Sequence, residues 1–275
     1  MKNRINEFQS DNYQVGFVPT MGYFHQGHTS LMERSIGDNL ITVVSIFVNP
    51  IQFGPGEDYQ IYPRDLSGDQ QVAEQLGVDV LFVPNAEDMY PEDFGTQVHV
   101  SGITDALCGA SRPGHFAGVT TVVSKLFNIV QPDRAYFGRK DYQQLLVIQQ
   151  MVTDLNKNID IIGCPIAREK DGLAVSSRNV NLTESQRRSA PVLYHSLQEA
   201  KSKIMKGDKN PQALKEMIEN KIAAEPETEI DYVEIVDGDN LSKLTQIQGN
   251  VLIALAVHLG DTRLIDNVLI QLDEY

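Results

Sequence analysis

The feature that most constrains the fold of this chain is a nearly unbroken apolar, β-branched run, LITVVSIFV, at residues 40–48. A strand with one face in water alternates apolar and polar residues, whereas this run has no polar face. Such a strand must be covered on both sides, as it is in a parallel sheet flanked by helices. The run therefore predicts an α/β fold.

The rest of the first half repeats this organisation, with short apolar runs separated by segments of helical spacing. Because strands that alternate with helices are joined by right-handed crossovers, they form a parallel sheet. We therefore predict a Rossmann-like sheet with helices on both faces. The expected strands are residues 15–18, 40–48, 78–83, 134–137 and 160–162, and the expected helices are residues 31–36, 65–76 (closed by Gly77), 119–130 and 141–155.

The last third differs in pattern. Residues 184–205 and 211–224 have the spacing of amphipathic helices, and three β-rich runs follow, at 229–236, 251–259 and 263–270. Two helices followed by consecutive strands indicate a small α+β domain. We place the boundary at 165–167, which gives a first domain of residues 1–166 and a C-terminal lid domain of residues 167–275.

Composition narrows the class of function. The 37 acidic residues outnumber the 23 basic ones, and a net charge of −14 disfavours nucleic-acid partners. The two cysteines, Cys108 and Cys164, form no CxxC pair, which is typical of a reducing compartment. The sequence has no signal-peptide pattern and no apolar run long enough to span a membrane. We therefore expect a cytoplasmic enzyme or small-molecule binder without a membrane partner.

Polar side chains gather in four loops where strands are expected to end or the two domains to join. These loops are PTMGYFHQGH (19–28), NPIQFGPGEDY (49–59), FGRKDYQQ (137–144) and AREKDGLAVSSRN (167–179). Ligands of open parallel sheets bind beyond the carboxyl ends of the strands. The four loops are therefore the candidate site.

His25 and His28 stand where a helix is expected to begin. A helix N-terminus attracts phosphate through its N–H groups and its dipole, and two imidazoles there can donate to phosphate oxygens. Gly27, between them, would let a flat base approach the backbone. The alternative is a polar turn or a metal site, although zinc needs further ligands at close spacing, and none is present.

Other side chains of these loops also suit a polyphosphate. Asp141 can cap a helix or hold a ribose hydroxyl, while Gln52 and Gln144 can bind hydroxyls or carboxylates without adding charge. The alternatives are a solvated helix cap at 138–141 and an interdomain linker around residue 177. The candidate phosphate-binding side chains are Lys140, Ser176, Ser177 and Arg178.

Missing motifs exclude other kinds of catalyst. The chain has no GxxxxGK[ST] phosphate loop, no GxGxxG after the first strand and no GxSxG nucleophile elbow. The remaining chemistry is charge stabilisation and positioning of a phosphate substrate, without a covalent intermediate on the protein.

Taken together, five motifs resemble those of the pantothenate synthetase (pantoate–β-alanine ligase) family. They are PTMGYFHQGHTSL, FVNPIQFGPGEDY, RPGHFAGVTTVV, YFGRKDYQQL and DGLAVSSRN, and they occur in this order from residue 15 onward. Within the wider nucleotidyltransferase superfamily, HxGH corresponds to the HIGH signature of class I aminoacyl-tRNA synthetases. The SSR segment corresponds to their KMSKS loop.

The resemblance implies a two-step reaction. The pantoate carboxylate attacks the α-phosphorus of ATP to give pantoyl adenylate and pyrophosphate, and the β-alanine amine then displaces AMP. It also implies Mg²⁺ on the leaving group, a homodimer formed through the first domain, and a C-terminal lid that shields the intermediate from water.

The resemblance further implies residue roles. His25 and His28 contact the phosphates, with His28 as proton donor, and Gln52 and Gln144 hold pantoate, with Gln52 also at the β-alanine site. Lys140, Ser176, Ser177 and Arg178 complete the catalytic set. The remaining expected ATP contacts are Met21, Gly22, Tyr23, Phe24, Gln26, Gly27, Gly138, Arg139, Asp141 and the main chain of Ala167 and Val175.

The chain departs from the family pattern at a few positions. Only 14 residues precede Val15, so either the sheet lacks an initial edge strand or the start of the chain is misassigned. Phe24 replaces a usual leucine and Ala167 a common valine. Gly68 interrupts an acidic stretch, which leaves Asp69 as the candidate Mg²⁺ ligand and the other metal ligands unassigned.

Two other functions are compatible with parts of this pattern. One is a nucleotidyltransferase that transfers AMP or CMP to a phosphate substrate, which would need a cationic pocket in place of the two glutamines. The other is a catalytically silent nucleotide sensor, which would have lost the histidine pair or the serine–arginine segment. The sequence retains both.

Overall fold

A computed structural model describes residues 1–11 and 13–272 of the chain, which divides into two compact units. The first unit comprises residues 1–104, 112–139 and 143–165, and the second comprises residues 105–111, 140–142 and 166–275. A single boundary at residue 166 would leave the segments 105–111 and 140–142 in the first domain. The structure groups both with the second unit.

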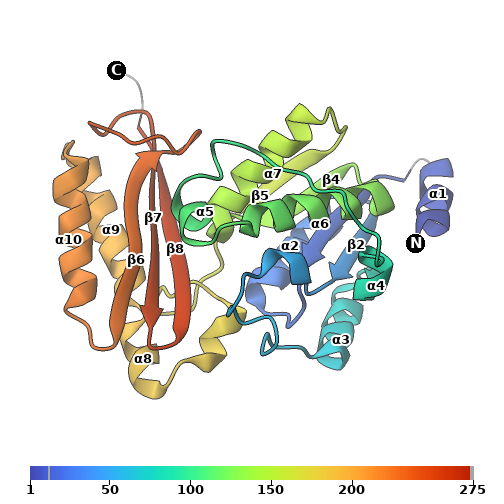
Figure 1. The fold of residues 1–275 in the computed structure, drawn as a ribbon, viewed down its shortest axis with the longest axis horizontal. Coiled ribbons are helices and arrows are strands. Elements are labelled where there is room, and N and C mark those ends of the chain that lie inside the picture. Colours follow the sequence, from blue (N-terminus) through green and yellow to red (C-terminus); the bar gives the residue numbers. More distant parts are fainter. Residues whose placement is uncertain (12, 273–275) are drawn as a thin grey trace. The chain divides into compact units, whose positions relative to one another are not determined.

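The first unit contains a parallel five-stranded sheet (Figure 1), which confirms the predicted Rossmann-like α/β fold. The strand order is β3-β2-β1-β4-β5, so the direction of winding reverses between β1 and β4. Strand β2 is buried at every position, as its lack of a polar face requires. The strands are β1 (Val15–Thr20), β2 (Ile41–Ile46), β3 (Val80–Phe82), β4 (Arg134–Gly138) and β5 (Asp160–Cys164).

Helices cover both faces of this sheet. On one face Val18 and Val44 pack with Met32 of α2. On the other, the ring of Phe127 in α6 lies edge-on to Phe17 and Phe137 of the sheet, with centroids 6.3 and 6.4 Å apart. The helices in this part of the chain are α1 (Lys2–Ser10), α2 (Gln26–Asp38), α3 (Leu66–Leu76), α4 (Ala86–Met89), α6 (His115–Val130) and α7 (Tyr142–Asp154).

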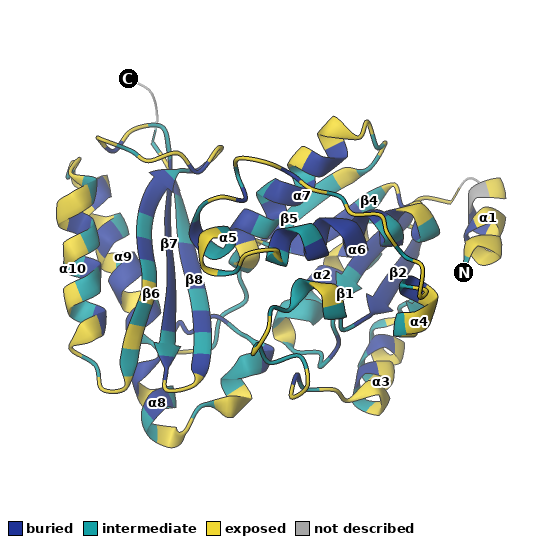
Figure 2. Ribbon diagram, viewed as in Figure 1, coloured by how far each residue is buried: buried dark blue, intermediate teal, exposed yellow. Residues whose placement is uncertain are grey.

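The second unit is the small α+β domain that the sequence predicts. Its antiparallel sheet has the order β6-β7-β8, and β7 is buried along nearly its whole length (Figure 2). Leu197 of α9 and Ile218 of α10 belong to its core, together with Leu255 of β7. The elements are α5 (Leu107–Ser111), α8 (Glu184–Ser189), α9 (Val192–Met205), α10 (Pro211–Ala223), β6 (Thr228–Asp237), β7 (Asn250–Leu259) and β8 (Thr262–Gln271).

Some predicted element bounds were wrong. The helix expected over 184–205 is broken into α8 and α9 at Pro191, because proline has no N–H to continue the helical hydrogen bonds. Helix α6 begins at His115, four residues early, after Gly114 in the left-handed conformation (φ +83°). The stretch before Val15 contains helix α1, which buries Ile5 and Phe8.

Among the helices of the described residues, none is long and apolar enough to cross a bilayer.

Candidate active site

The two predicted histidines lie at the N-terminus of α2, which follows β1. The Nδ1 atom of His25 accepts a hydrogen bond from the Gly27 N–H (3.1 Å), and that of His28 accepts one from the His25 N–H (3.4 Å). The rings stack with their centroids 4.0 Å apart. Because both Nδ1 atoms accept, a neutral imidazole at either position carries its proton on Nε2. The turn therefore presents two Nε2–H donors at the positive end of a helix.

Gly27 has a structural role in this turn. A Cβ at this position would lie 2.8 Å from Cε1 of His25. The absent side chain thus makes room for the His25 ring. The glycine allows the ring to fold back and cap the helix.

The segment before the histidines is fixed by Asp69 of α3. Its carboxylate accepts from the N–H groups of Tyr23 (2.8 Å) and Phe24 (2.6 Å). These bonds hold a turn in which Gly22 and Tyr23 both have positive φ, +84° and +54°. Burial raises the pKa of Asp69 above its ordinary value, although the two hydrogen bonds oppose the shift. Both oxygens accept from the loop, so a Mg²⁺ ion at Asp69 would have to share the carboxylate with these two N–H groups.

No other metal site is evident in the part of the chain that the structure describes. None of its His, Cys, Asp and Glu side chains form a cluster of three suited to holding a metal ion.

Gln52 ends the short 3₁₀ turn Pro50–Gln52, which follows β2. Its Oε1 accepts from Nδ2 of Asn49 (2.9 Å), and its Nε2 donates to Sδ of Met21 (3.4 Å). Asn49 is buried, and its Oδ1 accepts from the Tyr90 hydroxyl (2.7 Å). Gln52 thereby links the loops after β1 and β2, and its amide has a fixed orientation.

The start of α6 supports the same turn. Nδ1 of His115 lies 2.9 Å from the Gln52 carbonyl, and a Cβ on Gly118 would lie 2.5 Å from Cα of Gln52.

Arg112, just before α6, pairs with Glu57 through two hydrogen bonds, at 2.7 and 2.5 Å. Burial opposes ionisation of Glu57, but the Arg112 guanidinium outweighs it and holds the pKa of that carboxyl below its usual value.

Sequence reasoning missed Asn49 and His115 as parts of this region. Both lie in motifs that carry the family resemblance, Asn49 just after an apolar run and His115 four residues before an expected helix. The signal that could have identified both is a polar side chain close to the end of an expected strand or helix.

The other first-unit candidates follow β4, the neighbour of β1 in the sheet. Gly138 ends β4, and Arg139 is exposed in the turn that follows. Gln144 lies in the first turn of α7 and is partly exposed, whereas Gln143 is buried and donates to the Ile103 carbonyl. The loops after β1 and β4 leave the sheet where its winding reverses, the usual ligand position in this architecture.

The second unit holds the serine–arginine segment at the end of a small hairpin. Arg168 and Ala174 form an antiparallel bridge, and the Val175 N–H donates to the Ala167 carbonyl (3.0 Å). Ser176 then caps the 3₁₀ turn Ser177–Asn181, because its Oγ accepts from the Arg178 N–H (3.3 Å). The segment is thus a folded hairpin followed by a capped turn.

Lys140 belongs to this same unit. Its carbonyl accepts from Nδ2 of Asn267 (2.8 Å), while Asp141 beside it is exposed. The structure therefore gathers the candidates in two sets. The first unit holds Met21–His28, Gln52, Gly138, Arg139 and Gln144, and the second holds Lys140, Asp141, Ala167 and Val175–Arg178.

Comparison with known proteins supports the resemblance. The model of the pantoate–β-alanine ligase family matches residues 1–269. A pantothenate synthetase of Caldicellulosiruptor saccharolyticus is 55% identical over 98% of this chain and 96% of its own length. One from Acetivibrio thermocellus is 56% identical over 94% and 92%.

Solved structures agree with the sequence relatives. The pantothenate synthetase of Thermus thermophilus has a TM-score of 0.91 at 47% identity, over 96% of both chains. A pantoate–β-alanine ligase from Francisella tularensis, complexed with β-γ ATP and β-alanine, has a TM-score of 0.76 at 38% identity, over 96% of this chain and 95% of its own. On these matches, which span nearly its whole length, the chain belongs to the pantoate–β-alanine ligase family.

Proposed function

We propose that this ligase joins pantoate to β-alanine through a pantoyl-adenylate intermediate, with ATP as the activating substrate. A carboxylate oxygen of pantoate forms a bond to the α-phosphorus while pyrophosphate leaves. The β-alanine amine then attacks the acyl carbon, loses a proton and displaces AMP. The observation that carries the proposal is the placement of both imidazoles at the start of α2, where the Nδ1 atom of each accepts a main-chain hydrogen bond.

Electrostatics explains why such donors are needed. A carboxylate must approach a triphosphate of like charge, and each unit pair at ~4 Å costs about 4 kcal/mol at an effective dielectric of ~20. Donors fixed in advance lower this barrier most where charge grows in the transition state. We assign this role to His25 and His28. We also assign the role of proton donor to His28, through its Nε2–H.

We assign the remaining phosphate contacts to the second unit. Lys140 and Arg178 supply positive charge, and Ser176 and Ser177 supply hydroxyl donors. The main chain of Ala167 and Val175 would contact adenosine through the Ala167 N–H and the Val175 carbonyl, because the Val175 N–H already donates to Ala167. The other proposed ATP contacts are Met21, Gly22, Tyr23, Phe24, Gln26, Gly27, Gly138, Arg139 and Asp141.

Pantoate and β-alanine need neutral polar partners, because a cation beside the attacking carboxylate would lower its nucleophilicity. We assign pantoate to Gln52 and Gln144, and β-alanine to Gln52. The bonds of the Gln52 amide to Asn49 and Met21 support this assignment, since they fix which end of the amide donates.

Three further properties are part of the proposal. Mg²⁺, carried by the ATP phosphates, would neutralise the leaving pyrophosphate. Asp69 would keep its hydrogen bonds to the loop before the histidines. Use of ATP and two free cysteines support a cytoplasmic location. The largely exposed Leu40 and Ile61 of the first unit (69% and 78%) support a homodimer through that unit, which light scattering can measure.

The test is the dependence of AMP formation on both acids. We expect AMP only when ATP, pantoate and β-alanine are all present, and pantoate-dependent exchange of pyrophosphate into ATP without β-alanine. A stable nucleotidylated product that accumulates without any amine would instead identify a nucleotidyltransferase. ATP binding without turnover would identify a nucleotide sensor.

A further inference from the structure

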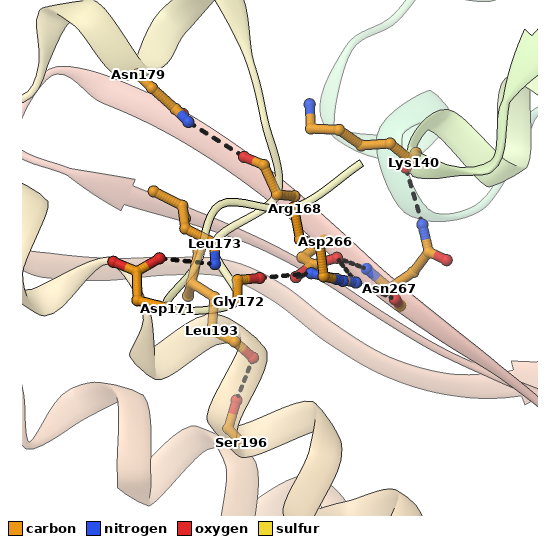
Figure 3. A network of polar contacts seen from close by, with 11 residues as sticks. Lys140, Arg168, Asp171, Gly172, Leu173, Asn179, Leu193, Ser196, Asp266 and Asn267 are labelled. Atoms are coloured by element: carbon orange, nitrogen blue, oxygen red, sulfur yellow. Dashed lines mark hydrogen bonds and ion pairs between the residues drawn. The ribbon is translucent and has the colours of Figure 1, made fainter. Parts of the chain in front are cut away.

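Lys140 is held in the second unit through its main chain. Nδ2 of Asn267 in β8 donates to the Lys140 carbonyl at 2.8 Å (Figure 3). Asn267 is buried, so water does not compete for this bond. Two residues after the lysine, the Tyr142 hydroxyl donates to the Gly238 carbonyl at 3.1 Å. The turn that carries the lysine is thus fastened at two points.

The hairpin that carries the serine–arginine segment is fastened to the same strand. The Arg168 guanidinium makes two hydrogen bonds to the Asp266 carboxylate, at 2.7 and 2.9 Å (Figure 3). The Asp266 side chain is 2% exposed, and Arg168 also lies over the Tyr194 ring, 4.5 Å from its centroid. A bidentate pair of this kind fixes direction as well as distance. It therefore sets the base of the hairpin.

The two anchors are consecutive residues of one strand. Asp266 and Asn267 are paired with Leu255 and Ala254 of the fully paired central strand β7. Consecutive side chains of a strand point to opposite faces, so neighbouring positions can hold two different segments. Two adjacent residues of β8 therefore hold both the hairpin and the turn that contains Lys140.

We propose that Asp266 and Asn267 are positioning residues for ATP, which together set the spacing between Lys140 and the Ser176–Arg178 segment. This inference rests on the proposed function, in which both segments contact the polyphosphate. Neither anchor touches substrate. Asn267 acts through Lys140, and Asp266 acts through Arg168 and its hairpin.

The experiment is a double-mutant cycle read by ATP binding. Asn267→Ala is made in the native chain and in Lys140→Ala, and the dissociation constant of β,γ-imido-ATP is measured by calorimetry. In the native chain we expect binding to weaken about 10- to 100-fold, the scale for misplacing a positioned group. In the Lys140→Ala chain we expect less than about a twofold change, because the ammonium through which Asn267 acts is gone.

The second anchor has the corresponding cycle. Asp266→Asn keeps the shape of the side chain and removes its charge, and its background variant is Arg178→Ala. Here too we expect the loss in binding to shrink in the background variant.

A second variant tests the first anchor. Asn267→Ser keeps a hydroxyl donor, and we expect it to bind the analogue more tightly than Asn267→Ala.

A matched control separates positioning from stability. Ser196→Ala deletes another buried side-chain hydrogen bond to a carbonyl of the second unit, from Oγ to Leu193 at 2.9 Å (Figure 3). We expect it to leave the affinity for the analogue unchanged, whatever it does to the melting temperature.

The possible results are distinguishable. Equal losses in both backgrounds, or unchanged affinity in Asn267→Ala, would overturn the positioning role. A native chain that binds the analogue but shows no pantoate-dependent pyrophosphate exchange would refute the proposed ligase reaction, while the cycle still decides the anchors. A native chain that does not bind the analogue would overturn both.

Discussion

At the scale of single residues, the histidine turn shows how the main chain sets the chemistry of a side chain. Both imidazoles use Nδ1 as an acceptor, so the proposed phosphate contacts depend on the far nitrogen, Nε2. An asparagine amide can replace the Nδ1 side of the ring, and a glutamine amide can reach toward Nε2. These two substitutions therefore separate the observed capping role from the proposed phosphate-binding role.

We predict that His28→Asn lowers pantoate-dependent pyrophosphate exchange by about 10²- to 10³-fold, the scale for removing one oxyanion-type donor. His28→Gln, which restores a distal donor, should retain more activity. Asn can still accept from the His25 N–H, so its melting temperature should stay close to that of the native protein. Equal activity of the two variants would mean that Nε2 of His28 has no such role.

The sequence located the histidines because they form a recognised motif at a strand end, but it did not reveal what holds their turn. Asp69 lies more than forty residues away, and its acidic neighbours suggested a metal ligand instead. Only the folded chain brings its carboxylate to the N–H groups of Tyr23 and Phe24. Side chains that bond to distant main-chain groups leave no periodic signal.

At the scale of elements, the ion pair of Glu57 and Arg112 joins the loop after β2 to the segment just before α6. The two side chains are 25% and 19% exposed, so their pair is screened less than a surface pair. The folded-state pKa of Glu57 lies below its ordinary value of 4.5. Its contribution to stability is therefore present above pH 4.5 and is lost as the pH falls through the lower, folded-state pKa.

We predict that Glu57→Gln lowers the free energy of unfolding by about 1 kcal/mol at pH 7, and that this difference disappears on acidification below the folded-state pKa. Urea unfolding of both proteins across this pH range measures it. Glu7→Gln is the control, because its pair with Arg4 is more than 60% exposed on both sides and should contribute little. A difference between Glu57→Gln and the native protein that persists in acid would show that the charge is not the cause.

Element types were easier to predict than element ends. The run at 40–48 predicted an interior strand, β2, because a segment without a polar face has few alternatives. The ends depend on single residues: Pro191 divides one expected helix, and Gly114 starts another earlier than its apolar pattern does. Helix α1 was missed because Ile5 and Phe8, the buried apolar side chains among those that the structure describes in it, stand in a polar stretch.

At the scale of the whole molecule, the sequence predicted two domains but not where each candidate residue belongs. Lys140 follows β4 directly along the chain, and so it was placed with the first domain. Its carbonyl bonds to Asn267, and the Tyr142 hydroxyl bonds to Gly238, far along the chain in each case. These hydrogen bonds between distant residues place the turn in the second unit. A local sequence pattern contains no information about them.

That division gives a prediction about ATP itself. If one nucleotide engages the residues assigned in both units, then β,γ-imido-ATP with pantoate should slow hydrogen exchange in residues 21–28 and in residues 166–178, because ligand binding suppresses local opening where it makes contacts. Helices α1 and α10 contain none of the assigned residues and should exchange as before. Protection confined to 21–28 would show that Lys140 and the serine–arginine segment do not bind the nucleotide. Protection in both segments that is lost in His28→Asn but kept in Ser196→Ala would link the two sets of residues to one bound ATP.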